Sequence, residues 1–171
     1  MELVSRLAGE PWTDRPSGVH PVLGSVARAV HDHSTSAGRR ELLPLAPHFL
    51  DTARPGFEPS ARVVALCVST ALAGGELRPD EHRRLRAAHQ TALHLLGTRE
   101  RPAGAARWWL SVLGRRSEAF YRTFVATEHA AEAIAVTART VSDVRLRGLL
   151  KQCLAAHGAA VRPSPSWSAS A

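Results

Sequence analysis

The sequence predicts an all-α fold: a single-domain bundle of about six to eight helices around a central apolar helix at about residues 60–73. Apolar residues recur three or four positions apart in most segments, and no segment of useful length alternates apolar and polar residues as a strand does. Aromatic residues make up only 5% of the chain. Leu, Val and Ala must therefore build the core, which favours closely packed helices.

Three segments in the first half of the chain carry apolar residues on one helical face. In the second of them Pro21 fits the first turn, where its missing N–H is not needed. Pro44 and Pro47 should split or kink the third segment, because each proline removes a helical hydrogen bond. The predicted elements are helices at 1–8, 21–33 and 39–54, with a Pro- and Gly-rich loop at 9–19.

The central helix and the elements after it follow similar signals. Ser60 is predicted to cap the central helix and Gly74 to end it, and almost no polar face remains between them, which is typical of a buried helix. Acidic residues after Pro79 favour the start of the next helix. In the long helix that follows, Phe120 and Phe124 are predicted to lie on the buried stripe. The later predicted helices are Pro79–Gly97, a short helix with Trp108–Trp109, Ser117–Thr140, and a last helix from Ser142 to Gly158.

Length and composition predict one domain followed by a tail. A chain of 171 residues with 44% hydrophobic residues has the size and composition of an ordinary globular domain. We expect residues 1–158 to form this helical domain. Residues 159–171 are rich in Pro, Ser and Ala and are predicted to be a disordered tail.

The chain is basic, with 22 Lys and Arg residues against 15 Asp and Glu residues and a net charge of +7. Nearly all the cations are arginines, since Lys151 is the only lysine. Together with abundant Ala, Gly and Pro, this bias indicates a GC-rich genome more than an anionic partner. Nucleic-acid binding is therefore not favoured, but an arginine strip beside Trp108–Trp109 is an alternative, because stacking and phosphate contacts need such a mixture. The strip consists of Arg83, Arg84, Arg86, Arg99, Arg101 and Arg107.

Cysteine usage and hydropathy predict a reduced, cytoplasmic protein. Cys67 and Cys153 show no metal or redox spacing, and Cys67 is expected to be a small buried hydrophobic residue. Residues 1–8 lack the basic start and long apolar core of a signal peptide. The longest apolar run, Val63–Ala73, is too short and too interrupted to span a bilayer, so no membrane association is expected.

Nine histidines invite a metal interpretation, which their spacing argues against. His82 and His89 share a helix face but lie seven residues apart, a rise of about 10 Å, which is too far for one ion. No pair has the spacing of a zinc or di-iron helix. We therefore predict no metal and no cofactor.

Residues 9–33 combine a Pro-rich entry with a cluster of polar side chains, which such an entry should hold in fixed positions. His20 precedes Pro21 and is thereby pushed out of helical geometry, so it is free to cap the helix or to point into a cleft. Asp32 lies near the carboxyl end of the helix, where the dipole disfavours a carboxylate. It therefore either pairs with Arg28, a histidine or a backbone amide, or serves a ligand. The candidate residues are Trp12, Asp14, His20, Arg28, Asp32 and His33.

Three motifs in this segment, GEPWxDxP, HPxL and ARxVxDH, carry a resemblance to known proteins. The combination resembles a family of small helical actinobacterial proteins of unassigned function, over roughly the first 50 residues. The resemblance implies a helical fold and the six candidate residues above, and it implies no reaction. It also implies that Asn often replaces His31 and that Cys or Thr often replaces Gly18, so His31 is not expected to be essential.

Three hypotheses about function follow. The first is a non-catalytic regulatory or accessory protein that acts through a protein partner or self-association, because no metal spacing, phosphate loop or nucleophile arrangement is recognisable. The second is a small enzyme or ligand-binding protein with a pocket where the Pro-rich loop meets the following helix. There His20 or His33 would be the acid or base. Asp14 or Asp32 would orient it, and Arg28 would hold an anionic group. The third is nucleic-acid binding through the arginine strip.

Overall fold

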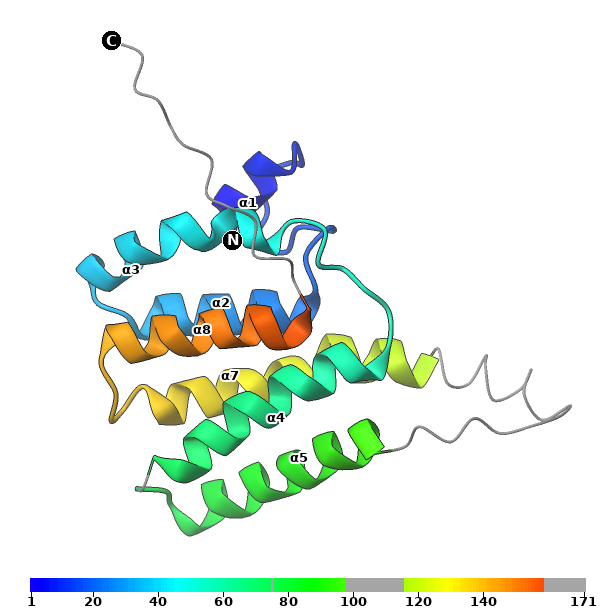
Figure 1. Ribbon diagram of the computed structural model, residues 1–171, viewed down its shortest axis with the longest axis vertical. Helices are drawn as coiled ribbons and strands as arrows, with labels where there is room; N and C mark the ends of the chain where they lie inside the picture. Colours follow the sequence, from blue (N-terminus) through cyan, green and yellow to red (C-terminus); the bar gives the residue numbers. More distant parts are fainter. Residues whose placement is uncertain (75, 98–115, 159–171) are drawn as a thin grey trace, which may run out of the picture.

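Four helices surround the core of the protein: α2 (Pro21–His33), α4 (Phe57–Ala73), α7 (Ala126–Thr137) and α8 (Asp143–His157). In the computed structural model, which describes residues 1–74, 76–97 and 116–158, α2 packs against α7 and α8. Helix α4 packs against the same two helices. In Figure 1, α8 lies in front of α2, and α4 lies in front of α7.

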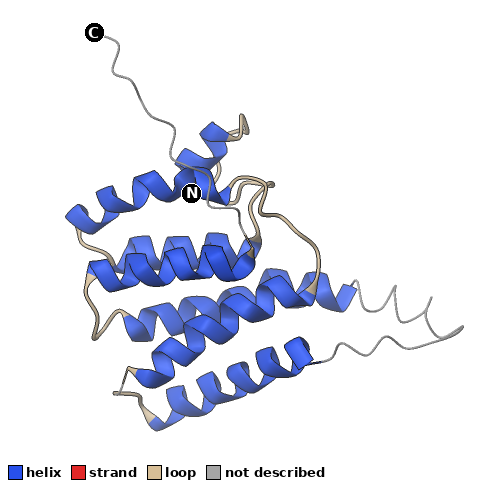
Figure 2. Cartoon of the chain, viewed as in Figure 1, coloured by secondary structure: helices blue, strands red, loops and turns tan. Residues whose placement is uncertain are grey.

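The other helices cover the outside of this group of four. Helix α5 (Pro79–Gly97) packs on α4, and α3 (Ser36–Leu42) and the 3-10 helix η1 (Leu43–Phe49) pack on α8. The short helix α1 (Glu2–Leu7) contacts η1. The described residues form seven α-helices and no strand (Figure 2), so the predicted all-α class is confirmed. None of these helices is long and apolar enough to cross a membrane.

The strongest sequence signals give the element bounds correctly. Helix α2 begins at Pro21 and ends at His33, as predicted, and its apolar face is fully buried. Helix α5 runs from Pro79 to Gly97, also as predicted. The two prolines in the predicted segment 39–54 do split it, because the α-helix ends at Leu42 and continues as the tighter η1.

The start of α4 differs from the prediction. The helix begins at Phe57, after Gly56 with a φ of 119°, and not at Ser60. Ser60 is therefore not a cap but a fully buried residue inside the helix. Glu58, Arg62 and Ser69 form an exposed strip along α4, so the helix is not apolar all round.

The predicted buried stripe of the long helix is wrong at its start. Phe120 and Phe124 are 58% and 60% exposed, and Tyr121 is buried in their place. The physical reason is a π-helical turn, η2 (Tyr121–Val125), which inserts extra backbone and changes which side chains face the core. Farther along, Ile134 lies in the core, as predicted.

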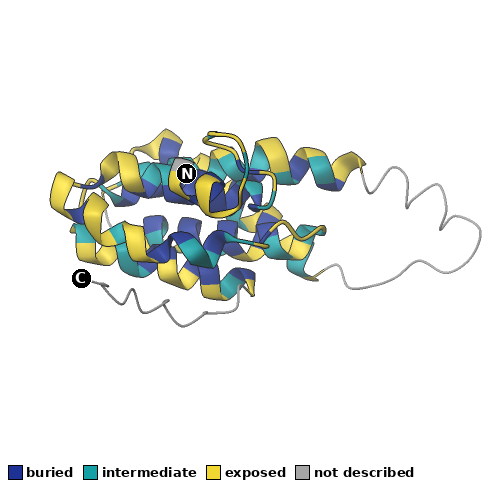
Figure 3. Ribbon diagram, turned by 90° about the horizontal axis from the view of Figure 1, so that it is seen from above, coloured by how far each residue is buried: buried dark blue, intermediate teal, exposed yellow. Residues whose placement is uncertain are grey.

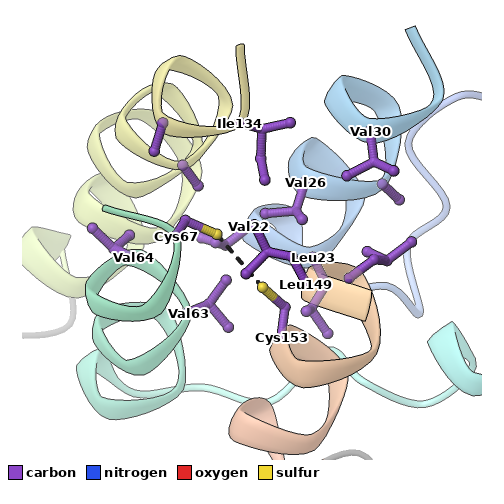
Figure 4. Packing of buried hydrophobic residues seen from close by; sticks show 14 of the residues in the cluster. Val22, Leu23, Val26, Val30, Val63, Val64, Cys67, Ile134, Leu149 and Cys153 are labelled. Atoms are coloured by element: carbon purple, nitrogen blue, oxygen red, sulfur yellow. Dashed lines mark hydrogen bonds between the residues drawn. The ribbon is translucent and has the colours of Figure 1, made fainter. Parts of the chain in front are cut away.

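The core is built from small and branched aliphatic residues, with few aromatic rings. Viewed from above, buried residues line the inner sides of two layers of helices (Figure 3). Figure 4 shows Leu23 and Val26 of α2 meeting Ile134 of α7 and Leu149 of α8. The Cys67 and Cys153 sulfur atoms lie 3.5 Å apart in this core, which confirms Cys67 as a buried residue (Figure 4).

We expect neither cysteine of the folded protein to react with the thiol reagent DTNB. Both side chains are fully buried, and the hydrogen bond with Cys153 and burial raise the pKa of Cys67, so little thiolate forms. In concentrated guanidinium chloride two thiols per chain should react at once. Rapid titration of either thiol in native buffer would contradict the packing of α4 against α8.

Two sequence predictions fall on residues outside the described ranges. These are the short helix with Trp108–Trp109 and the disordered tail at 159–171. Three arginines of the predicted strip, Arg99, Arg101 and Arg107, lie there as well.

Candidate ligand-binding cleft

A cleft of about 670 Å³ separates the start of α2 from the η2–α7 segment. We call it the α2–α7 cleft. One wall is formed by residues 15–28, and the other by residues 122–131. The Ser25 hydroxyl donates a hydrogen bond to the Thr127 carbonyl oxygen at 2.9 Å, which ties the two walls together. This volume falls in the range of small-molecule sites.

Local backbone contacts place His20 in the first wall. Its φ and ψ of −61° and 126° are extended, as expected before Pro21, and its side chain does not cap α2. The His20 N–H donates to Thr52 Oγ1 at 3.0 Å, and the Thr52 hydroxyl donates to the Phe49 carbonyl oxygen at 2.7 Å. The Ala53 N–H donates to the Gly18 carbonyl oxygen at 3.1 Å. These bonds fix the entry loop against the end of η1.

The His20 ring is buried among polar groups. Its Nε2 lies 3.4 Å from Ser60 Oγ, and its ring meets the edge of the His157 ring at a centroid distance of 4.5 Å. His20 is fully buried and His157 is 4% exposed. Yet His20 Nδ1 and both ring nitrogens of His157 have no hydrogen-bond partner among the described residues. Buried polar atoms without a partner are rare in folded proteins. Here they gather where the start of α2 meets the end of α8.

Burial keeps both histidines neutral. It lowers the pKa of His20 to about 3, with further contributions from His157 and Arg122. Burial also lowers the pKa of His157 to about 4, assisted by the charge of Arg54. Desolvation penalises the charged imidazolium, and nearby cations add to this effect.

Three arginines and one glutamate line the cleft: Arg15, Arg28, Arg122 and Glu128. Arg28 is half-buried, and desolvation by burial lowers its pKa. In the described part of the chain its guanidinium donates only to the Asp14 carbonyl oxygen, at 2.8 Å. From the other wall, Arg122 lies 3.4 Å from a Glu118 carboxylate oxygen and donates to the Arg54 carbonyl oxygen at 3.4 Å. Its buried Nε has no acceptor among the described residues.

Of the six candidate residues, the structure brings His20 and Arg28 together in the cleft. Trp12 is 63% exposed and lies under the Arg6 guanidinium, at 5.8 Å from the ring centroid. The Asp14 side chain is exposed, and only the backbone of this residue contacts Arg28. Neither Trp12 nor Asp14 lines the cleft.

The end of α2 lies outside the cleft. Asp32 is exposed, and its carboxylate lies 3.2 Å from His31 Nδ1. Of the partners expected for this carboxylate at the end of α2, it therefore contacts a histidine. His33 is exposed as well. Neither residue lines the cleft.

Sequence reasoning missed the second wall of the cleft. Arg122 was not among the candidate residues, and its partner Glu118 is only 9% exposed. Phe124 was expected in the core, but it is exposed and lines the cleft. Arg122 and Phe124 both lie in the π-helical turn η2. Such a turn has no sequence signature like that of a proline or a cap, so it could not be predicted. Such turns are frequent at functional sites.

The predicted arginine strip is weakened by ion pairs. Arg84 binds Asp80 on its own helix at 2.9 Å and Glu132 of α7 at 2.8 Å. Arg83 and Arg86 are exposed on α5. Over the described ranges, no group of three or more His, Cys, Asp or Glu residues has the geometry of a metal site.

Comparison with known proteins gives no relative. No protein-family model matches the chain, and no curated protein or solved structure is significantly similar to it. The resemblance to small helical actinobacterial proteins therefore stays a prediction.

Proposed function

We propose that the protein binds a small organic anion in the α2–α7 cleft. The observation that carries this proposal is the position of Arg28 and Arg122 on the two walls of a cleft that His20 also lines. Arg28 is partly desolvated and bonds only a carbonyl oxygen, and Arg122 keeps a buried N–H without an acceptor. A carboxylate or phosphate group would accept N–H groups of both arginines, and it would pair with Arg28, which forms no ion pair among the described residues, whereas Arg122 already has Glu118 beside it.

The protonation of the site favours binding over acid–base catalysis. A general base works best when its pKa is near the working pH, whereas the pKa of His20 is about 3. The carboxylates of Asp14 and Asp32, which were expected to orient the histidine, lie outside the cleft. A neutral, buried imidazole is better suited to one directed hydrogen bond with a ligand. Action through a protein partner stays a prediction.

Titration with small anions tests the proposal. We expect at least one of phosphate, succinate and benzoate to shift the amide NMR signals of Gly24 and Thr127 saturably. Arg28→Gln and Arg122→Gln should each weaken that binding at least about tenfold, since a hydrogen bond to a charged group contributes about 1.5–3 kcal/mol. Arg83→Gln, which changes an exposed arginine of α5, is the matched control and should bind normally.

Two results would contradict the proposal. One is that none of the three anions shifts the signals of the cleft. The other is that binding is the same in the wild type, Arg28→Gln and Arg122→Gln. A melting temperature close to that of the wild type would show that each variant is folded.

A further inference from the structure

We infer that Cys67 and Cys153 form a site of oxidative cross-linking, at which hydrogen peroxide converts the two thiols into one disulfide between α4 and α8. This inference is independent of the proposed function, because neither cysteine lines the α2–α7 cleft. Three features carry it: the contact between the two sulfur atoms, their enclosure in the core, and the helices that they would join.

The two thiols meet although they are far apart in the chain. Cys67 and Cys153 are separated by 86 residues in the sequence, so spacing alone could not pair them. In the structure their sulfur atoms point toward each other from α4 and α8 at a distance of 3.5 Å (Figure 4). A disulfide bond of about 2.05 Å needs the sulfur atoms to approach by a further ~1.5 Å. Small rotations of the two side chains, divided between them, supply such a movement.

The reaction balances with one molecule of hydrogen peroxide. A thiolate of the pair attacks a peroxide oxygen, the O–O bond breaks, and the cysteine becomes a sulfenic acid while one water is released. The sulfur of the second cysteine then attacks the sulfenic sulfur, so that the S–S bond forms and a second water leaves. Two thiols are thereby oxidised to one disulfide, and the peroxide is reduced to two waters.

Enclosure in the core determines which product forms. Both side chains are fully buried, so thiols of other molecules are kept away from the sulfenic acid, whereas the second cysteine is already in contact with it. Burial and the hydrogen bond with Cys153 raise the pKa of Cys67, so thiolate is scarce and the reaction is slow. Hydrogen peroxide, which is much smaller than DTNB, needs only a small opening of the core to enter. Because the chain has two cysteines, no other intramolecular disulfide competes.

The disulfide would join the two helices that enclose His20. Ser60 contacts His20 Nε2 and lies about two turns before Cys67 on α4. His157 contacts the His20 ring and lies about one turn after Cys153 on α8. The bond closes a loop of the chain that contains α5 and α7. Closing so long a loop restricts the unfolded chain, so the oxidised protein should be the more stable form.

Treatment of the folded protein with millimolar hydrogen peroxide tests the inference. After free thiols have been blocked in denaturant, we expect a non-reducing digest to contain a peptide that joins Cys67 to Cys153, identified by mass spectrometry. The melting temperature of the treated protein should rise by at least about 5 °C. Cys67→Ala and Cys153→Ala each keep one thiol and are the matched controls. Their melting temperatures should not rise after the same treatment.

Three results would overturn the inference. One is that both thiols of the wild type stay free after prolonged treatment. Another is that the cysteines accumulate as sulfinic acids or link separate chains, because either product would show that the second thiol does not capture the sulfenic acid. The third is that the cross-link forms without a rise in melting temperature, which would contradict its fit to the packing of α4 against α8. The linked peptide is measured in the wild type, so this result does not depend on the folding of the variants.

Discussion

Lowering the pH from 6.5 to about 4.5 should destabilise the protein by about 3 to 5 kcal/mol. The pKa values of His20 and His157 in the folded state are about 3 and about 4, below the 6.5 of an unperturbed histidine. In this window the unfolded chain binds more protons than the folded one, so falling pH favours unfolding. Each of the two histidines lowers the free energy of unfolding by about 1.4 kcal/mol for every unit that the pH falls. Urea unfolding across the window measures the slope.

Two variants test whether His20 and His157 cause this dependence of stability on pH. His157→Gln removes one titrating group, and the slope should fall by roughly half. His33→Gln changes an exposed histidine and should leave the slope unchanged. The carboxylate of Glu81, whose pKa is lowered by its hydrogen bond to Arg139, loses its stabilising effect only below its ordinary pKa of 4.5. A flat stability profile from pH 6.5 to 4.5 would contradict the burial of the two rings as neutral groups.

Leu23→Ala should lower the free energy of unfolding by about 3 kcal/mol. Leu23 is fully buried between α2 and the opposite helices, so the substitution removes apolar contacts and leaves a cavity (Figure 4). Leu43→Ala, at a leucine that is 56% exposed, is the matched control and should cost less than about 0.5 kcal/mol. Chemical unfolding of the two variants at neutral pH gives the comparison.

Equal stability of the two leucine variants would contradict the position of α2. The same helix carries Gly24 and Arg28 and directly follows His20, so its attachment to the core also sets the geometry of the cleft. Where Leu23→Ala is still folded, we expect it to bind anions more weakly than Leu43→Ala, although neither leucine lines the cleft.

The fold could be predicted wherever one residue type determines the backbone. Pro21 starts α2, Pro79 starts α5, and Pro44 marks where an α-helix gives way to a tighter one. Such signals act within a few residues and need no tertiary contact. The start of α4 was missed because Ser60 is a good capping residue in isolation, whereas packing extends the helix back to Phe57.

Half of the candidate site was not accessible from the sequence. His20 and Arg28 stand in one segment with a rigid entry, and both were found there. Arg122 and Phe124 belong to a π-helical turn about a hundred residues later. Helical spacing placed Phe124 in the core, because it assumes an unbroken α-helix, and it gave no role to Arg122. Only tertiary structure places them opposite α2.

The order in which the chain is synthesised gives the packing of α2 a further consequence. Its buried residues Val22, Leu23 and Val26 are synthesised about a hundred residues before α7 and α8, the helices against which α2 packs most closely. The apolar face of α2 is therefore left without its partner helices until about a hundred further residues have been synthesised. Contacts between residues so far apart in the sequence form slowly. A nascent chain that stops before α7 would expose this face to chaperones and would lack the second wall of the cleft.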